Sequence, residues 1–330
     1  MSGTAPPSER GTSRDLLPVI LAGPTAVGKS AVALELAQRL DGEIVSVDSM
    51  QVYRGLDIGT AKPSPEERRR IPHHGVDVVG LDDAFDAARF ATLATASIPD
   101  IQARGRVPIL CGGTGLYFNA WMNGLGDAPA PDPELRMQLE ALPTPALLEE
   151  LARTDPATFD DIDPNNRRRL VRAVEVIRIT GRPFSTQRAR WPDRAPTLAG
   201  RAFGLWRNRP DTVARIDARV DRMFRNGLVE ETRALRAQGL PGNRTASQAI
   251  GYRQVLEHLD GVRGPLETRE QVKIRTRQFA KRQMTWFRGQ MDLTWMEISP
   301  TEEPAVTADR ILDAIQSGSR PHSFPQGNRQ

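Results

Sequence analysis

The segment Gly23–Ser30, GPTAVGKS, constrains the fold of this chain more than any other feature. It matches the Walker A pattern G-x-x-x-x-G-K-S. The apolar run LLPVILA at residues 16–22 precedes it, and SAVALELAQRL at residues 30–40 follows it. Apolar residues recur in the second run at helical spacing, at Ala33, Leu36, Ala37 and Leu40. We therefore predict a strand, a phosphate-binding loop and a helix.

This loop is suited to a diphosphate or triphosphate. Its successive backbone N–H groups and the helix N-terminus form a nest for anions, Lys29 neutralises terminal oxygens, and the Ser30 hydroxyl can hold Mg²⁺. Among 45 basic residues only four are lysines, Lys29, Lys62, Lys273 and Lys281. Since lysine is a compact point charge, its retention at Lys29 fits a tightly enclosed phosphate. ATP, GTP and prenyl diphosphates all offer the same group.

Further apolar runs predict additional strands. They lie at residues 43–48, 75–79, 106–111, 202–206 and 293–297. Near-continuous apolar strands separated by helices indicate a parallel sheet covered on both faces, so the expected fold class is α/β with a P-loop NTPase-like core. Residues 85–104 have helical spacing, but Pro99 should kink or restart that helix.

The chain divides by composition into five parts. Residues 1–14 and 317–330 are rich in small and polar residues and are expected to be disordered. Residues 15–122 form the first part of an α/β core, and residues 123–196 show only helical patterns, so they are interpreted as a helical insertion domain. The second part of the core, residues 197–316, ends in C-terminal helices.

Charge and composition exclude several classes of protein. No apolar stretch is long enough to span a membrane, and the N-terminus has no apolar leader, so we expect a cytoplasmic protein with no membrane association. Cys111 is the single cysteine and is interpreted as a small buried strand residue. The side chains of the adjacent His73 and His74 should diverge rather than share a metal.

The net charge of the chain is only +4, yet arginines cluster in residues 164–190 and 263–288. Either a solvated surface or nucleic-acid binding could explain these clusters.

Polar residues follow two of the predicted strands. Asp48 ends the second strand and should open into the ligand crevice beside the phosphate loop. A Mg²⁺ ligand or a helix cap is the alternative reading of Asp48. Gly112, Gly113 and Thr114 end another strand, where glycines either allow a ligand close to the backbone or form a plain tight turn.

Seven strings in this order resemble the bacterial tRNA dimethylallyltransferase (isopentenyl-diphosphate:tRNA transferase) family. They are the phosphate loop, DSMQVYRGLDIGTAKP, PHH, RGRVPILCGGTGLY, RRLVRAVEV, QAIGYRQ and KRQMTWFRGQ, and the likeness runs from about Leu16 to Trp295. The resemblance implies transfer of a prenyl group from dimethylallyl diphosphate to the exocyclic amine of adenosine 37 of tRNA, with Mg²⁺ and release of diphosphate. Met50 and Cys111 depart from residues common in relatives, but neither departure touches this chemistry.

The resemblance implies that residues 15–122 and 197–316 form the catalytic core, and that the insertion, residues 123–196, and the C-terminal helices of the core contact tRNA. It also implies roles for individual residues. Asp48 is the expected general base, Lys29 and Arg219 are the expected catalytic cations with Arg215 as a weaker candidate, and Ser30 is the expected metal ligand. The expected diphosphate site comprises Gly23, Pro24, Thr25, Ala26, Val27, Gly28, Lys29 and Ser30. The expected tRNA contacts are Asp48, Ser49, Met50, Gln51, Thr114, Arg136, Arg168, Arg169, Leu170, Val171, Arg172, Gln248, Ala249, Ile250, Gly251, Tyr252, Arg253, Lys281, Arg282, Gln283, Met284, Thr285, Trp286, Phe287 and Arg288.

Three other functions remain open from the residues alone. A small-molecule kinase or NTPase would explain the phosphate loop but lacks a recognisable Arg-rich lid motif. An adenylate isopentenyltransferase would prenylate free nucleotides, whereas the helical insertion and arginine clusters favour a large RNA. A non-catalytic RNA-binding module would leave Asp48 and the loop without a role. We expect a monomer whose partners are the anticodon stem-loop of tRNA and dimethylallyl diphosphate.

Overall fold

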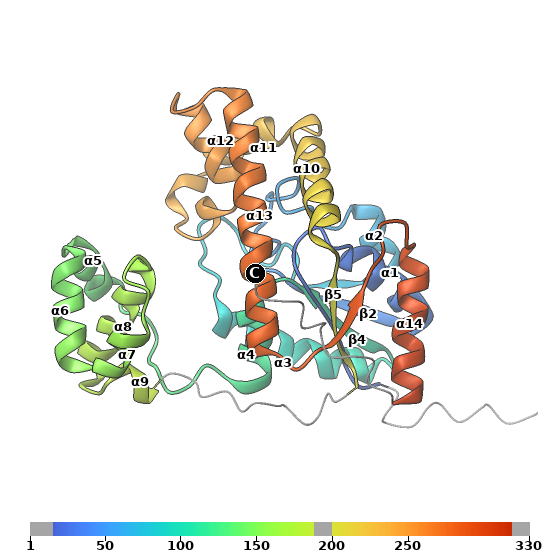
Figure 1. The fold of residues 1–330 in the computed structure, drawn as a ribbon, viewed down its shortest axis with the longest axis horizontal. Helices are drawn as coiled ribbons and strands as arrows, with labels where there is room; N and C mark the ends of the chain where they lie inside the picture. Colours follow the sequence, from blue (N-terminus) through green and yellow to red (C-terminus); the bar gives the residue numbers. More distant parts are fainter. Residues whose placement is uncertain (1–15, 188–199, 319–330) are drawn as a thin grey trace, which may run out of the picture. The chain divides into compact units, whose positions relative to one another are not determined.

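The computed structural model describes residues 16–187 and 200–318 (Figure 1). The chain forms two compact units: unit 1 comprises Met1–Met122 and Asp193–Gln330, and unit 2 comprises Asn123–Pro192. The predicted disordered segment at residues 1–14 and most of that at 317–330 lie outside the described residues. Ser317 itself is the last residue of helix α14, Pro304–Ser317.

Unit 1 is built on one parallel sheet with the strand order β3-β2-β4-β1-β5-β6. The strands are β1 Val19–Ala22, β2 Gly42–Val47, β3 His73–His74, β4 Val107–Gly112, β5 Ala202–Trp206 and β6 Thr294–Glu297. Every residue of β1, β2 and β4 is buried, as the apolar runs predicted for strands covered on both faces. The predicted α/β class and parallel sheet are confirmed.

The third strand was predicted in the wrong place. Strand β3 is His73–His74 rather than residues 75–79, and Val79 forms only an isolated bridge with Tyr53. Gly75 and Asp77 have φ angles of 76° and 55°, in the left-handed region that a strand cannot contain. The chain therefore bends at residues 75–77, and Val76 and Val78 lie outside any strand.

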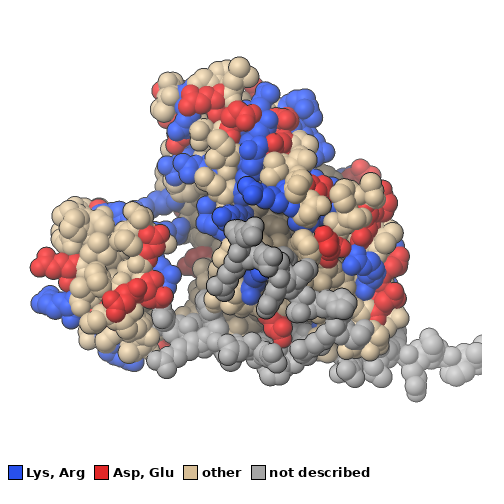
Figure 2. All heavy atoms as spheres, viewed as in Figure 1, with Lys and Arg blue, Asp and Glu red and all other residues tan. Residues whose placement is uncertain are grey.

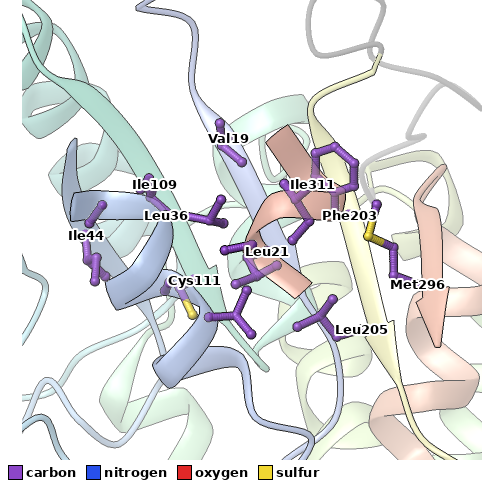
Figure 3. Packing of buried hydrophobic residues seen from close by; sticks show 14 of the residues in the cluster. Val19, Leu21, Leu36, Ile44, Ile109, Cys111, Phe203, Leu205, Met296 and Ile311 are labelled. Carbon is purple, nitrogen blue, oxygen red and sulfur yellow. The ribbon is translucent and has the colours of Figure 1, made fainter. Parts of the chain in front are cut away.

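Helices cover both faces of the sheet. Helices α1, Lys29–Arg39, and α14 pack together, and Leu36 and Ile311 from these helices meet Leu21 and Phe203 from the strands (Figure 3). Helix α3, Ala87–Ala103, contacts β2 and β4 through buried Phe90 and Ala94. Cys111 of β4 is buried in the same hydrophobic cluster as Leu21 and Leu36, in agreement with its interpretation as a small buried strand residue.

Pro99 was predicted to kink or restart this helix, and the predicted restart is wrong. The helix continues through Pro99 to Ala103. Pro99 lies on the exposed side of this helix, next to buried Ile98. Water can therefore solvate the carbonyl that loses its helical partner, and the helix tolerates the ring.

The other helices of unit 1 surround the carboxyl edge of the sheet. They are α2 Pro65–Arg70, α4 Gly115–Asn123, α10 Arg209–Arg225, α11 Leu228–Ala237, α12 Tyr252–Leu259 and α13 Pro265–Gln290. Helices α10 and α13 run antiparallel, because Asp217 pairs with Arg277 at 2.5 Å and Asp221 pairs with Lys273 at 3.0 Å. Within the described residues no helix is long and apolar enough to cross a membrane.

Unit 2 consists of helices. They are α5 Pro133–Ala141, α6 Thr144–Thr154, α7 Pro156–Asp161, α8 Arg167–Thr180 and α9 Phe184–Gln187. Leu139, Leu147 and Leu170 are fully buried in its core. The insertion was predicted over residues 123–196, of which 188–196 lie outside the described residues.

Candidate active site

A cavity of about 790 Å³ opens at the carboxyl edge of the sheet in unit 1. The phosphate loop, Asp48 and Gly113 form one side of it, and residues of α10 and α13 form another. Its walls include charged groups such as Arg219 and apolar ones such as Phe279. The site therefore lies where parallel α/β sheets generally bind ligands, outside the carboxyl ends of strands.

The phosphate loop has the geometry of an anion nest. Ala26 and Gly28 adopt left-handed conformations, with φ of 65° and 109°. The carbonyl of Ala26 accepts a hydrogen bond from Arg215 Nε at 2.9 Å, and that of Val27 accepts one from Arg207 Nε at 2.8 Å. With these carbonyls bonded to side chains and the first N–H groups of α1 lacking helical acceptors, the loop can present N–H groups to an anion.

Lys29 lines the cavity and is half-buried. The pKa of its ammonium is lowered to about 8, mainly by burial and also by the nearby Arg219, while Cys111 and Asp48 act in the opposite direction. Its Nζ donates to the carbonyl of Pro24 at 2.7 Å. A partly desolvated cation that bonds to one backbone carbonyl is suited to neutralising an incoming phosphate.

Asp48 and Thr114 lie beside each other at the ends of β2 and β4. The Thr114 Oγ1 accepts a hydrogen bond from Ser49 N–H at 3.1 Å, and Asp48 Oδ1 accepts bonds from the N–H groups of Met50 at 2.8 Å and Gln51 at 3.3 Å. Only one carboxylate oxygen is used in this turn. Asp48 thus caps a turn, and no helix begins there, while its carboxylate also lines the cavity.

Helix α10 supplies a row of arginines to the cavity. Arg215, Arg219 and Arg222 line it from one face of the helix, and Arg219 Nη2 donates to the Thr60 carbonyl at 3.2 Å. Burial lowers the pKa of Arg219, and the carboxylate of Asp48 raises it. The family resemblance led us to expect Arg219 here, with Arg215 one helical turn earlier as a weaker candidate, whereas Arg222 was not predicted.

The loop that carries Thr60 is fixed by a network that the sequence did not reveal. Glu231 of α11 accepts a hydrogen bond from Ile58 N–H at 3.0 Å, and Tyr252 OH donates to Glu231 at 2.5 Å. The N–H of Gly59 donates to Tyr252 OH at 3.0 Å. Burial raises the pKa of both Glu231 and Tyr252. Tyr252, expected at the tRNA surface, is fully buried and holds this loop.

The expected tRNA contacts at residues 248–253 and 281–288 of unit 1 differ in their exposure. Exposed side chains on α13 and near α12 include Lys281, Arg282, Thr285, Arg288, Gln248 and Arg253. Buried residues include Ala249, Gly251, Tyr252, Gln283 and Phe287, and Ile250, Met284 and Trp286 are half-buried. Figure 2 shows basic side chains, with acidic ones among them, over the region of α10 and α13. The buried side chains stabilise the unit rather than forming a surface.

In unit 2, Arg168 and Arg169 are exposed on α8, whereas Leu170 and Val171 are buried in the core. Arg136 and Arg172 both pair with Glu175, at 2.5 and 2.7 Å. Glu175 has no exposed surface. These two arginines therefore neutralise a buried carboxylate of their own unit, a role that the sequence pattern did not indicate.

The residues described hold no cluster of three or more His, Cys, Asp or Glu side chains fit to bind a metal. His74 Nε2 lies 2.6 Å from Glu43 Oε2, and His73 Nδ1 lies 2.7 Å from the carbonyl of Ile71. The cavity is lined by oxygen donors of the kind that Mg²⁺ prefers, among them the hydroxyl of Ser30 and the carboxylates of Asp48 and Asp57.

Comparisons with known proteins identify the family. A family model described as IPP transferase matches residues 51–290. The chain is 47% identical over 282 residues to tRNA dimethylallyltransferase 1 of Trichlorobacter lovleyi, covering 84% of this chain and 92% of that protein. It is also 47% identical over 297 residues to the tRNA dimethylallyltransferase of Anaeromyxobacter dehalogenans, covering 89% and 98%.

Solved structures agree with this assignment. The full-length tRNA isopentenylpyrophosphate transferase of Bacillus halodurans has a TM-score of 0.66 and 38% identity, covering 92% of this chain and 98% of that one. A eukaryotic dimethylallyltransferase acting on tRNA has a TM-score of 0.71 and 26% identity, covering 94% and 81%. The chain therefore belongs to the tRNA dimethylallyltransferase family.

Proposed function

We propose that this protein transfers a dimethylallyl group from dimethylallyl diphosphate to the N6 amine of adenosine 37 in tRNA. The observation that carries the proposal is one cavity lined by both the phosphate loop and Asp48. The family to which the chain belongs, and the names of its relatives, support the same reaction. The products are N6-(dimethylallyl)adenosine and diphosphate.

The donor diphosphate binds in the phosphate loop, from Gly23 to Ser30. As the allylic C–O bond breaks, the electron pair stays with the departing diphosphate, so negative charge grows there. The positive charges of Lys29 and Arg219 lie beside the proposed diphosphate position and stabilise this negative charge. A preorganised group of this kind contributes on the order of 3 kcal/mol to transition-state stabilisation. Stabilising the leaving group is therefore the main catalytic task of the loop.

The adenosine amine forms the new N–C bond and must lose a proton. Asp48 is the proposed base, because its second carboxylate oxygen is not used in the local turn and its side chain lines the cavity. General base catalysis of this kind contributes roughly 10²- to 10⁴-fold. Thr114 and Gln51 lie next to Asp48 and are the proposed contacts of the flipped base.

Mg²⁺ is the proposed cofactor, and the donor set fits it. Mg²⁺ prefers oxygen ligands and commonly binds through one or two protein groups, water and substrate phosphates rather than through an all-protein cage. Ser30, exposed at the start of α1, would supply the protein ligand. When bound, the ion would neutralise charge on the diphosphate.

The tRNA partner is proposed to dock through its anticodon stem-loop. A base in a loop can be turned out into a pocket at a cost of a few kcal/mol. Exposed basic residues of α8 and α13, including Arg168, Lys281 and Arg282, are the proposed phosphate contacts. We further propose that the enzyme works in the cytoplasm, where tRNA is modified, as a monomer.

Two substrate assays separate this proposal from its alternatives. With labelled ATP and tRNA, a kinase or NTPase would release labelled ADP or phosphate, whereas prenyl transfer needs no nucleotide turnover. With dimethylallyl diphosphate and AMP as the acceptor, an adenylate isopentenyltransferase would prenylate AMP. ATP turnover, or a preference for AMP over tRNA, would contradict the proposed function.

A further inference from the structure

The side chain of Gln283 spans two parts of the active site that are far apart in the sequence. Its Oε1 accepts a hydrogen bond from Thr25 N–H in the phosphate loop, with 2.8 Å between the heavy atoms. Its Nε2 donates to the Gly113 carbonyl, also at 2.8 Å. Only 8% of Gln283 is exposed. One amide thus bonds to the loop after β1 and to the end of β4.

This contact requires a side chain with a donor and an acceptor on the same terminal group. Glutamine provides both, whereas an ionised glutamate provides acceptors only. The approach to the strand end is also close, because a Cβ atom at Gly113 would lie 2.3 Å from Gln283 Nε2. The amide of Gln283 can therefore approach this closely only because Gly113 has no side chain.

One of the two bonded backbone groups lies near the proposed position of the prenyl donor, and the other lies near the proposed position of the acceptor amine. Thr25 lies in the phosphate loop, Gly23–Ser30, which is proposed to hold the donor diphosphate. Gly113 precedes Thr114, whose hydroxyl accepts the hydrogen bond from Ser49 N–H next to Asp48. Gln283 thereby connects the donor loop to the segment that holds the proposed base.

We propose that Gln283 is a positioning residue for prenyl transfer, which fixes the distance between the donor diphosphate and the acceptor amine beside Asp48. This inference rests on the proposed function. The side chain of Gln283 also lines the cavity, but the proposed role is exerted through its two hydrogen bonds, to Thr25 and Gly113. Because a misplacement of about 1 Å can cost roughly 10²-fold in rate, a small shift between these segments should slow the reaction.

Two substitutions test this role. Gln283→Met has a similar length but cannot form either hydrogen bond, so kcat should fall about 10- to 100-fold while the KM for tRNA stays within about twofold. The kcat of Gln283→Glu should be equally low while the introduced carboxyl group is ionised. When protonated, its carboxyl again offers one donor and one acceptor, so its rate relative to wild type should rise as the pH falls from 8 to 6.

Burial and the facing Gly113 carbonyl should favour the protonated form of that glutamate. The matched control is Gln278→Glu, which makes the same charge change at an exposed position of α13. Its rate relative to wild type should not change with pH. Melting temperature and tRNA affinity establish that each variant is folded.

Amide hydrogen exchange at Thr25 provides a readout that does not need activity. Loss of the Gln283 acceptor should speed exchange at Thr25 by at least about tenfold in Gln283→Met but not in Gln278→Glu. Unchanged exchange, a wild-type kcat in Gln283→Met, or a constant relative rate of Gln283→Glu between pH 8 and 6 would overturn the inference. An inactive wild type with the expected exchange difference would instead contradict the proposed function and leave the Gln283 contact supported.

Discussion

The ammonium of Lys29 donates a hydrogen bond to the carbonyl oxygen of Pro24, 2.7 Å away across the phosphate loop. Burial, more than any charge, lowers the pKa of this ammonium to about 8. A bound diphosphate places negative charge beside it and favours the protonated form. Donor binding and the protonation of Lys29 are therefore linked.

This linkage predicts a pH dependence of donor affinity. About half of Lys29 is neutral at pH 8 in the free enzyme, so binding must take up a proton and the dissociation constant should rise from pH 7 to pH 9. Lys29→Arg should remove this dependence, because arginine stays charged, and should also weaken donor binding because its planar fork is larger. Calorimetry with dimethylallyl diphosphate measures both effects. An equal pH dependence in the two proteins would exclude Lys29 as the linked group.

Asp48→Asn should lower the rate of prenyl transfer about 100-fold or more. The amide oxygen can still accept the hydrogen bonds from Met50 and Gln51, so the fold and the tRNA affinity should be retained. Single-turnover rates, with tRNA binding measured on the same sample, separate the two quantities. Wild-type turnover would rule out Asp48 as the base.

Tyr252→Phe should lower the free energy of unfolding by about 1–3 kcal/mol. The ring can still pack, but the N–H of Gly59 and the carboxylate of Glu231 lose their shared hydroxyl partner. Because the same loop presents the Thr60 carbonyl to Arg219, kcat should fall as well. Urea denaturation gives the stability change, and an unchanged midpoint would show that the hydroxyl does not stabilise this loop.

Reversing the charge of Arg168, Lys281 and Arg282 together, each to Glu, should weaken tRNA binding and flatten its salt dependence. Each lost phosphate contact removes roughly 0.7 to 0.9 from the log–log slope, so about two units should be lost. A control triple variant at the exposed Arg69, Arg153 and Arg233 makes the same net change. Filter binding over a salt series compares them, and donor affinity should not change. Equal effects of both triples would mean that only net charge matters.

The sequence predicted the sheet well because its central strands are apolar and buried on both faces, a pattern that few other structures produce. It also placed Asp48 and Thr114 at strand ends, which a parallel sheet brings to one edge. It failed at β3, where left-handed Gly75 and Asp77 interrupt a run of valines. Local propensity could not reveal that the chain turns there.

Contacts between distant segments could not be predicted from spacing. Gln283 and Tyr252 lie in strings typical of the family and were expected to contact tRNA, but both are buried and hold active-site loops. Arg172 was counted in a basic cluster, and its partner Glu175 lies only three residues away. The sequence could not show that Glu175 is buried and therefore requires both Arg136 and Arg172.

Mass analysis of tRNA nucleosides tests the central claim most directly. Unmodified tRNA incubated with the protein, dimethylallyl diphosphate and Mg²⁺ should yield N6-(dimethylallyl)adenosine in the fragment that contains position 37, and omission of the diphosphate donor should abolish it. A tRNA with guanosine at position 37 should yield no prenylated nucleoside. Prenylation elsewhere in the tRNA, or none with folded protein and intact tRNA, would contradict the account.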